Sequence, residues 1–212
     1  MNKTGSMALT SAIALITAIL LGVVAVSVLS DSTTSTNSEQ DLIERYNQII
    51  DESVDEISTY IKITDRLGKY YGGPQKQKIE KIALMIKPLV SIDIDLSELT
   101  IEICNGKDVR ILSFNGETDK IGSKSLFDHY LWDKIKEDCY SFIVTHDKDN
   151  SIIDYKTINK NSDMGFIIIK LPDDFQMKKG GVLLVSIFPG TGITRNIALE
   201  APLPIKSVVS LD

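Results

Sequence analysis

Hydrophobic residues fill the first thirty positions of the chain almost without interruption. No charged residue occurs at 4–30, and the apolar side chains of 8–29 lie on every side of a helix. About 20 apolar residues suffice to cross the hydrocarbon layer of a bilayer, whereas the apolar run of a secretory signal peptide has only about 7 to 15. The pattern therefore predicts one membrane-spanning helix, and Lys3 ahead of it places the rest of the chain outside the cell.

Small side chains are interspersed among the large aliphatic residues of this helix. Small residues let helices approach one another closely in an apolar environment, so the helix suits packing against copies of itself. A lone membrane anchor also tolerates small residues, and composition alone leaves both interpretations open.

A second, amphipathic pattern follows the polar stretch 31–38. Its apolar positions fall at helical spacing, and acidic residues occupy the remaining positions, which is typical of a helix with one buried face. This helix either lies on the β-rich remainder of the chain or continues the first helix and packs against neighbouring subunits. The apolar positions are Leu42, Ile43, Tyr46, Ile49, Ile50, Val54 and Ile57.

Short runs of β-branched residues, separated by Gly, Pro, Asn and Asp, make up the chain beyond Ser58. One short surface helix holding Trp132 is expected near 126–135, where apolar residues take helical spacing. The predicted fold class is α+β, with a long N-terminal hydrophobic helix followed by an immunoglobulin-like antiparallel β-sandwich. Strands are predicted at 60–64, 78–86, 99–104, 109–114, 140–146, 165–171, 182–188 and 193–200, with turns at 105–106, 115–116 and 179–181 among others.

Composition and charge exclude several functions. The 212 residues are 43% hydrophobic and 25% charged, with a formal net charge of −6, so one core is expected and no basic surface for nucleic acid. The Gly-rich stretch 188–195 lacks the GxxxxGK(S/T) spacing that cradles phosphates, and His129 and His146 have no companion ligand motif. We therefore expect no enzyme, no cofactor and no nucleic-acid partner.

Two features of the β-rich part leave alternatives open. Cys104 and Cys139 lie near a strand end and a strand start, and outside the cell they form either a disulfide or two buried thiols. Oxygen-bearing side chains at 147, 149, 150 and 151 alternate as in a calcium loop, but the Gly and distal Glu of such a loop are missing. A solvated turn is the favoured interpretation, and no metal ligand is predicted.

Motifs along nearly the whole chain are similar, in their order, to those of one family. Lys3-Thr4-Gly5 directly before Ser6 is similar to a type IV pilin-like signal that is cleaved after Gly, and 23–29 to an Ala/Val-rich helix. The similarity continues through 68–72, 78–86 and 99–106 to the closing segment 194–202, which leads to Val208-Val209. With these motifs the chain resembles the archaellins, the subunits of the archaeal swimming filament.

The resemblance implies a mechanism without chemistry. A prepilin-type peptidase cuts a membrane-held precursor between Gly5 and Ser6, and the membrane assembly machinery adds the freed helix to a filament of identical or related subunits. The chain then divides into a leader at 1–5, a filament-core helix at 6–58 and an outer β-sandwich domain at 59–212. An apolar helix that leaves lipid is stable in water only among other apolar helices. The expected core-facing residues are Leu9, Ile13, Ile16, Ala18, Leu20, Val23, Val24 and Leu29.

The function expected from the resemblance is that of a structural subunit in an extracellular archaellum, with its precursor in the cell membrane. One alternative is a pilin-like adhesive or accessory archaellum protein, anchored by one transmembrane helix. Another is a single-span protein whose β-sandwich binds a partner. The processing signal at Gly5-Ser6 and the second helix favour the first two over the third.

Overall fold

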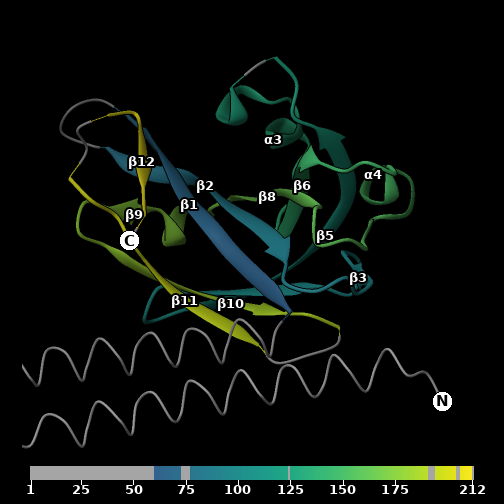
Figure 1. The fold of residues 1–212 in the computed structure, drawn as a ribbon. Coiled ribbons are helices and arrows are strands. Elements are labelled where there is room, and N and C mark those ends of the chain that lie inside the picture. Colours follow the sequence, from purple (N-terminus) through teal and green to yellow (C-terminus); the bar gives the residue numbers. More distant parts are fainter. Residues whose placement is uncertain (1–59, 73–76, 124, 191–193, 204–205, 212) are drawn as a thin grey trace, which may run out of the picture. The chain divides into compact units, whose positions relative to one another are not determined.

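The computed structural model describes residues 60–72, 77–123, 125–190, 194–203 and 206–211 (Figure 1). All of them fall within Ile50–Asp212, one of two units into which the chain divides. The leader, the apolar run and the amphipathic segment lie outside the described residues, so the helix assigned to 6–58 stays a prediction. In the described ranges, no helix combines the length and hydropathy needed to cross a membrane.

Alternating apolar residues and turn-forming Gly, Asn and Asp build the described part into strands. Each of the eight predicted strands is present, and β3, β7, β9 and β12 are additional short ones. The strands are β1 (Ile61–Tyr71), β2 (Lys78–Pro88), β3 (Ile94–Asp95), β4 (Thr100–Cys104), β5 (Val109–Lys120), β6 (Cys139–His146), β7 (Thr157–Ile158), β8 (Met164–Lys170), β9 (Met177–Lys178), β10 (Val182–Phe188), β11 (Arg195–Glu200) and β12 (Val208–Ser210). The helical pieces are α3 (Leu131–Lys134), α4 (Ser151–Tyr155) and the 3-10 turns η2 (Leu126–Asp128) and η3 (Asp173–Phe175).

One sheet of ten strands turns back on itself at β5 (Figure 1). Its order is β11-β10-β4-β5-β6-β8-β2-β1-β12, and β9 pairs with β2 beside this path. The first part of β5 pairs with β4 and the second part with β6, so β5 belongs to both halves of the sheet. The two halves face each other across a common core, which contains side chains from both.

The predicted antiparallel arrangement is confirmed for the described strand pairs except β5 with β6, which are parallel. Parallel neighbours need a crossover connection of a dozen or more residues. The segment 121–138, which contains η2 and α3, supplies that connection. The sheet is therefore mixed at this one point.

The predicted turn at 115–116 is wrong, because both residues lie inside β5. The pairing register of β5 with β6 shifts between Phe114 and Thr118, and Gly116 has a φ of 80°, which favours glycine. A bulge of this kind bends a strand without ending it. It lets β5 pass from one half of the sheet to the other.

A second, smaller core covers the outer face of the β1-β2-β8-β6 half. The predicted surface helix near 126–135 is in fact a 3-10 turn, η2, and a separate short α-helix, α3, which lie over this face. Trp132 is buried rather than at the surface, and its Nε1–H donates to the Leu126 carbonyl at 2.9 Å. The buried members of this core are Ala83, Phe127, Leu131, Trp132, Ile143, Phe166 and Ile168.

Candidate functional site

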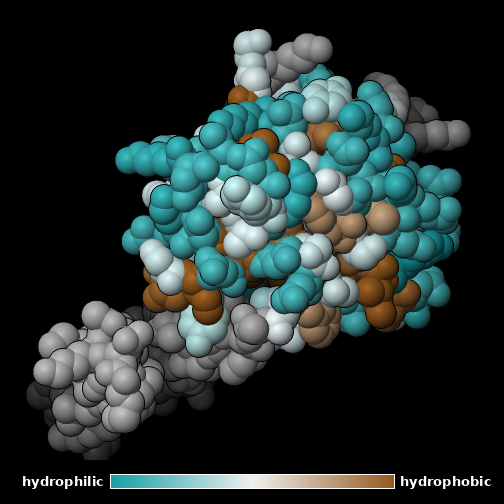
Figure 2. Space-filling view, turned by 90° about the vertical axis from the view of Figure 1, so that its right-hand side faces the viewer, coloured by the Kyte–Doolittle hydropathy of each residue, from teal (hydrophilic) through white to brown (hydrophobic). Residues whose placement is uncertain are grey.

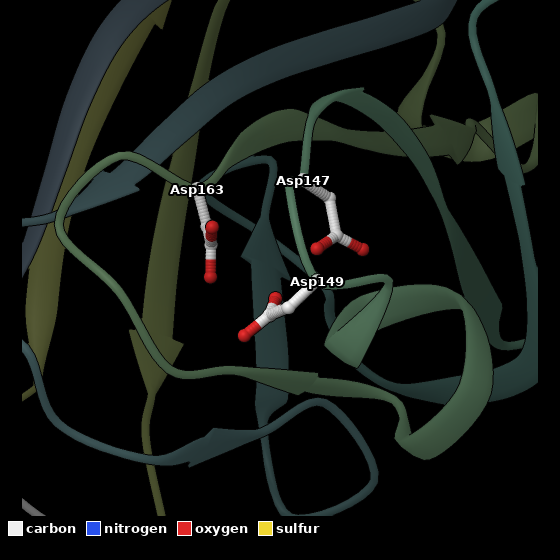
Figure 3. Close-up of side chains that lie close together, drawn as sticks. All are labelled: Asp147, Asp149 and Asp163. Carbon is white, nitrogen blue, oxygen red and sulfur yellow. The ribbon is translucent and has the colours of Figure 1, made fainter.

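Three aspartates from two loops converge at one end of the β6–β8 pair (Figure 3). Asp147 and Asp149 belong to the turn between β6 and α4, and Asp163 directly precedes β8. Because His146 pairs with Met164, the residues just after β6 and just before β8 lie opposite each other. One carboxylate oxygen from each aspartate lies within 4.8 Å of the others.

The two less exposed aspartates each hold a loop with one oxygen and leave the other oxygen unpaired. Asp163 is 0% exposed, and its Oδ2 accepts the backbone N–H groups of Asn159 and Lys160 at 3.1 and 3.0 Å. Asp147 Oδ2 accepts the backbone N–H of Ile152 at 3.1 Å. Both Oδ1 atoms are buried without a hydrogen-bond partner among the described residues. A donor or a cation stabilises a buried, ionised carboxylate oxygen, because burial removes its hydration.

Asp149 is the exposed member of the cluster. Lys160 Nζ lies 2.5 Å from its Oδ2, and Asn159 Nδ2 donates to the same oxygen at 3.3 Å. The hydrogen bond from Lys160 is the main cause that lowers the pKa of the Asp149 carboxyl, against the opposing effect of desolvation. The same bond raises the pKa of Lys160. One ammonium group therefore offsets part of the charge of three carboxylates.

The donor set fits a hard divalent cation such as Ca²⁺, which prefers several carboxylate oxygens. The sequence pattern at 147–151 contained only part of this cluster. Asn150 Oδ1 accepts Lys120 Nζ at 2.6 Å and Ser151 Oγ donates to Asn159 at 3.2 Å, so those two groups have partners of their own. The sequence reasoning missed Asp163. One signal pointed to it: the predicted strand 140–146 ends beside the first acidic loop, and the predicted strand 165–171 begins beside the second.

Cys104 and Cys139 are both free, and each is half-buried. Cys104 pairs with Val109 at the start of β5, whereas Cys139 pairs with Ser113 on the other side of the same strand. Four residues along a strand span about 13 Å, and a disulfide requires Cα atoms within about 7 Å. The alternative of two unpaired thiols is therefore the one that the structure contains.

Two groups of residues from the sequence analysis remain: the two histidines, and the predicted cleavage and filament-core positions. His129 is buried, and its Nδ1 accepts the backbone N–H of Leu131 at 3.3 Å, so it orders the start of α3. His146 is exposed at the end of β6. Gly5, Ser6 and the eight predicted filament-core residues lie outside the described residues and stay predictions.

Exposed apolar side chains gather on the outer face of the β11-β10-β4-β5 half. Val109 pairs with Cys104, Cys104 with Leu184, and Leu184 with Ala198, so these four form one row across four strands. Val109 is 56% exposed and Leu184 is 49% exposed. In Figure 2, hydrophobic side chains gather low on the domain, at the level where β10 and β11 lie in Figure 1. Large exposed apolar patches are typical of surfaces that contact other proteins.

This β-rich domain is similar in fold to an archaeal flagellin. The described fold is similar to the crystal structure of archaeal flagellin FlaB1 from Methanocaldococcus jannaschii, with a TM-score of 0.60 and 20% identity, over 71% of this chain and 95% of that one. The similarity confirms, at the level of fold, the archaellin resemblance of the sequence. The sequence matches no protein-family model and no curated protein.

Two other solved structures align with the chain at lower TM-scores. The archaeal flagellum of Methanospirillum hungatei strain JF1 aligns at a TM-score of 0.44 and 12% identity, over 96% of this chain and 97% of that one. The archaellum periplasmic stator protein complex FlaF and FlaG from Sulfolobus acidocaldarius aligns at 0.39 and 11%, over 66% and 88%. Both scores are too low to add to the argument from FlaB1.

Proposed function

We propose that this chain is a structural subunit of the archaeal swimming filament and polymerises through its N-terminal helix. The observation that carries the proposal is the fold shared with archaeal flagellin FlaB1 over 95% of that protein. The uncharged run 4–30 ahead of the domain supports it, because a polymer needs a surface that only other copies can cover.

In this proposal the precursor waits in the cell membrane until a prepilin-type peptidase cuts between Gly5 and Ser6. Assembly then moves the apolar helix from lipid into a bundle of the same helices. Each large aliphatic side chain that stays buried in the bundle avoids a loss of about 1.5–3 kcal/mol. The membrane machinery that adds subunits is a separate partner, and the filament contains this chain alone or with related subunits.

The outer domain takes the solvent side of the filament. Its role is structural: the aspartate cluster binds a divalent cation that ties the turn after β6 to the loop before β8, and the exposed apolar row at Leu184 contacts a neighbouring subunit. The alternative of a pilin-like adhesive or accessory archaellum protein keeps the same helix and domain but forms no propeller.

The test is the variant Gly5→Val in the producing cell. A β-branched residue at the cleavage point should leave an uncut precursor in the membrane and abolish filaments on the surface. Gly122→Val is the matched control, because a Cβ at Gly122 meets nothing within 4 Å. Normal filaments from the Gly5 variant would refute the proposed processing.

A further inference from the structure

A row of three lysines crosses the outer face of β1, β2 and β8. Lys69 pairs with Lys81, and Lys81 pairs with Lys170. Residues directly opposite each other in antiparallel strands share a face about 5 Å apart, where like charges repel. Lys78 of β2 and Lys178 of β9 form a further pair beyond the row. These five residues together are called the lysine face.

The domain itself neutralises only a small part of the lysine face. Among the described residues, Lys69 alone of the five has a carboxylate within ion-pair distance, Asp128 at 3.1 Å. Lys81 Nζ lies over the rings of Trp132 and Tyr71, at 5.0 and 5.4 Å from their centroids. Both rings hold the ammonium group by cation–π attraction without removing its charge.

The other three members of the lysine face also have no carboxylate within ion-pair distance among the described residues. Lys78 donates to the neutral Gln176 side chain at 3.5 Å. Lys170 and Lys178 are exposed. Glu80 lies at the β-bulge where the register of β1 and β2 shifts, and Asp128 already forms an ion pair with Lys69. A cluster of like charges held in place by a sheet is therefore open to an acidic partner.

The acidic charge of this chain lies in a different part of the sequence. Residues 1–59 contain two of the 23 basic residues and eight of the 29 acidic ones, so residues 60–212 contain 21 of each. The whole net charge of −6 therefore belongs to 1–59. Seven of those eight acidic residues are concentrated in 39–56, and they are Glu39, Asp41, Glu44, Asp51, Glu52, Asp55 and Glu56.

The predicted helix over this segment separates its acidic patch from its apolar stripe. Asp51, Glu52, Asp55 and Glu56 are neighbours on one side of a helix. At 100° per residue, the centre of this patch lies roughly 180° from the stripe that contains Ile50, Val54 and Ile57. Carboxylates four residues apart are about 6 Å apart along the axis, which is close to the spacing of about 5 Å between lysines on neighbouring strands.

We propose that the lysine face is the docking surface for the acidic segment 39–56 of a second copy of this chain. The inference rests on the proposed function, because it describes a contact between subunits of one filament. The two surfaces differ, so each copy offers a lysine face to one neighbour and an acidic segment to another. Such a heterologous contact repeats along a helical polymer. Charge pairing fixes the register of the contact and makes it sensitive to salt.

The experiment reverses the charge of the lysine face, then of the acidic segment 39–56, and then of both together. Lys170→Glu with Lys178→Glu uses exposed positions of the lysine face, and Asp51→Lys with Asp55→Lys uses the acidic segment. Each full-length variant is expressed in cells that produce filaments, and sheared filaments are quantified at rising NaCl concentration. Each one-sided reversal should lower the yield about tenfold, and the combined variant should restore it.

Lys107→Glu with Lys136→Glu is the matched control, since both residues are exposed and lie outside the lysine face. Restored filaments in the combined variant also show that the altered domain folds. Filaments from the Lys170 and Lys178 variant that equal the unaltered chain in yield and salt resistance would overturn the contact. So would a combined variant that is not restored. If the unaltered chain and the control form no filaments, the proposed function fails as well.

Discussion

Replacing Gly165 with alanine tests the close packing that joins β8 to β6. Gly165 pairs with Ile86 on one side and with Val144 on the other. A Cβ at this position would lie 2.6 Å from Phe142 Cζ and from the Ile143 carbonyl oxygen, whereas ordinary contacts between carbon atoms are about 3.5–4.0 Å. Both neighbours would have to move.

The size of the effect follows from what surrounds those neighbours. Phe142 is 0% exposed and belongs to the main core, so other buried side chains surround its ring. Overpacking of this kind costs about 1–3 kcal/mol, and displacing a carbonyl in the ladder between strands adds about 0.5–1.5 kcal/mol. The free energy of unfolding should fall by about 2–4 kcal/mol in total. For a domain of this size the Tm should then fall by about 4–16 °C.

The assay is thermal unfolding of purified filaments, followed by circular dichroism and compared with Gly122→Ala. Replacing either glycine lowers the conformational entropy of the unfolded chain to a similar extent. A Cβ at Gly122 meets nothing within 4 Å, so the difference between the two variants isolates the clash at β8. Equal Tm values would refute the packing argument.

Three further changes test the cation site, its charge balance and the filament core. Ca²⁺ at 100 times its dissociation constant should stabilise the domain against thermal unfolding by about 2.7 kcal/mol. Asp163→Asn should abolish that gain, whereas the control Asp154→Asn should keep it. A gain that survives in the Asp163 variant would contradict the site. Because Lys160 lowers the pKa of Asp149, their pair stabilises the fold above the unfolded pKa of about 3.9 and loses its effect as pH falls through the lower folded pKa. The free energies of unfolding of Lys160→Met and the unaltered chain should converge as pH falls through that range. A difference between them that stays constant down to pH 2 would be the contrary result. Ala18→Asp should abolish filaments while the outer domain keeps its protease resistance, because an unpaired charge in an apolar bundle is costly; intact filaments would place the helix outside the core.

Local pattern was sufficient for the strands that alternate buried and exposed residues. In β10, the buried residues Leu183, Val185 and Ile187 alternate with exposed or half-buried ones, so the period of two predicts both the strand and its inner face. The Asn-Gly pair at 115–116 shows the limit of such signals. A glycine at positive φ serves a hairpin turn and a bulge equally well, and the choice depends on β6, which is distant in sequence.

The same limit applies to the aspartate cluster. The spacing of Asp147 and Asp149 is a local property, but Asp163 joins them only because β6 and β8 pair antiparallel. Which strands become neighbours depends on the burial of whole faces and not on any short window. The parallel pairing of β5 and β6 was missed for the same reason.

The proposed function is tested most directly by the mass of the N-terminal peptide of this chain in filaments sheared from the producing cells. A peptide that begins at Ser6, found in abundant filaments, is the result expected for a processed and polymerised subunit. An uncut chain found only in membranes would contradict the filament role and favour an anchored protein.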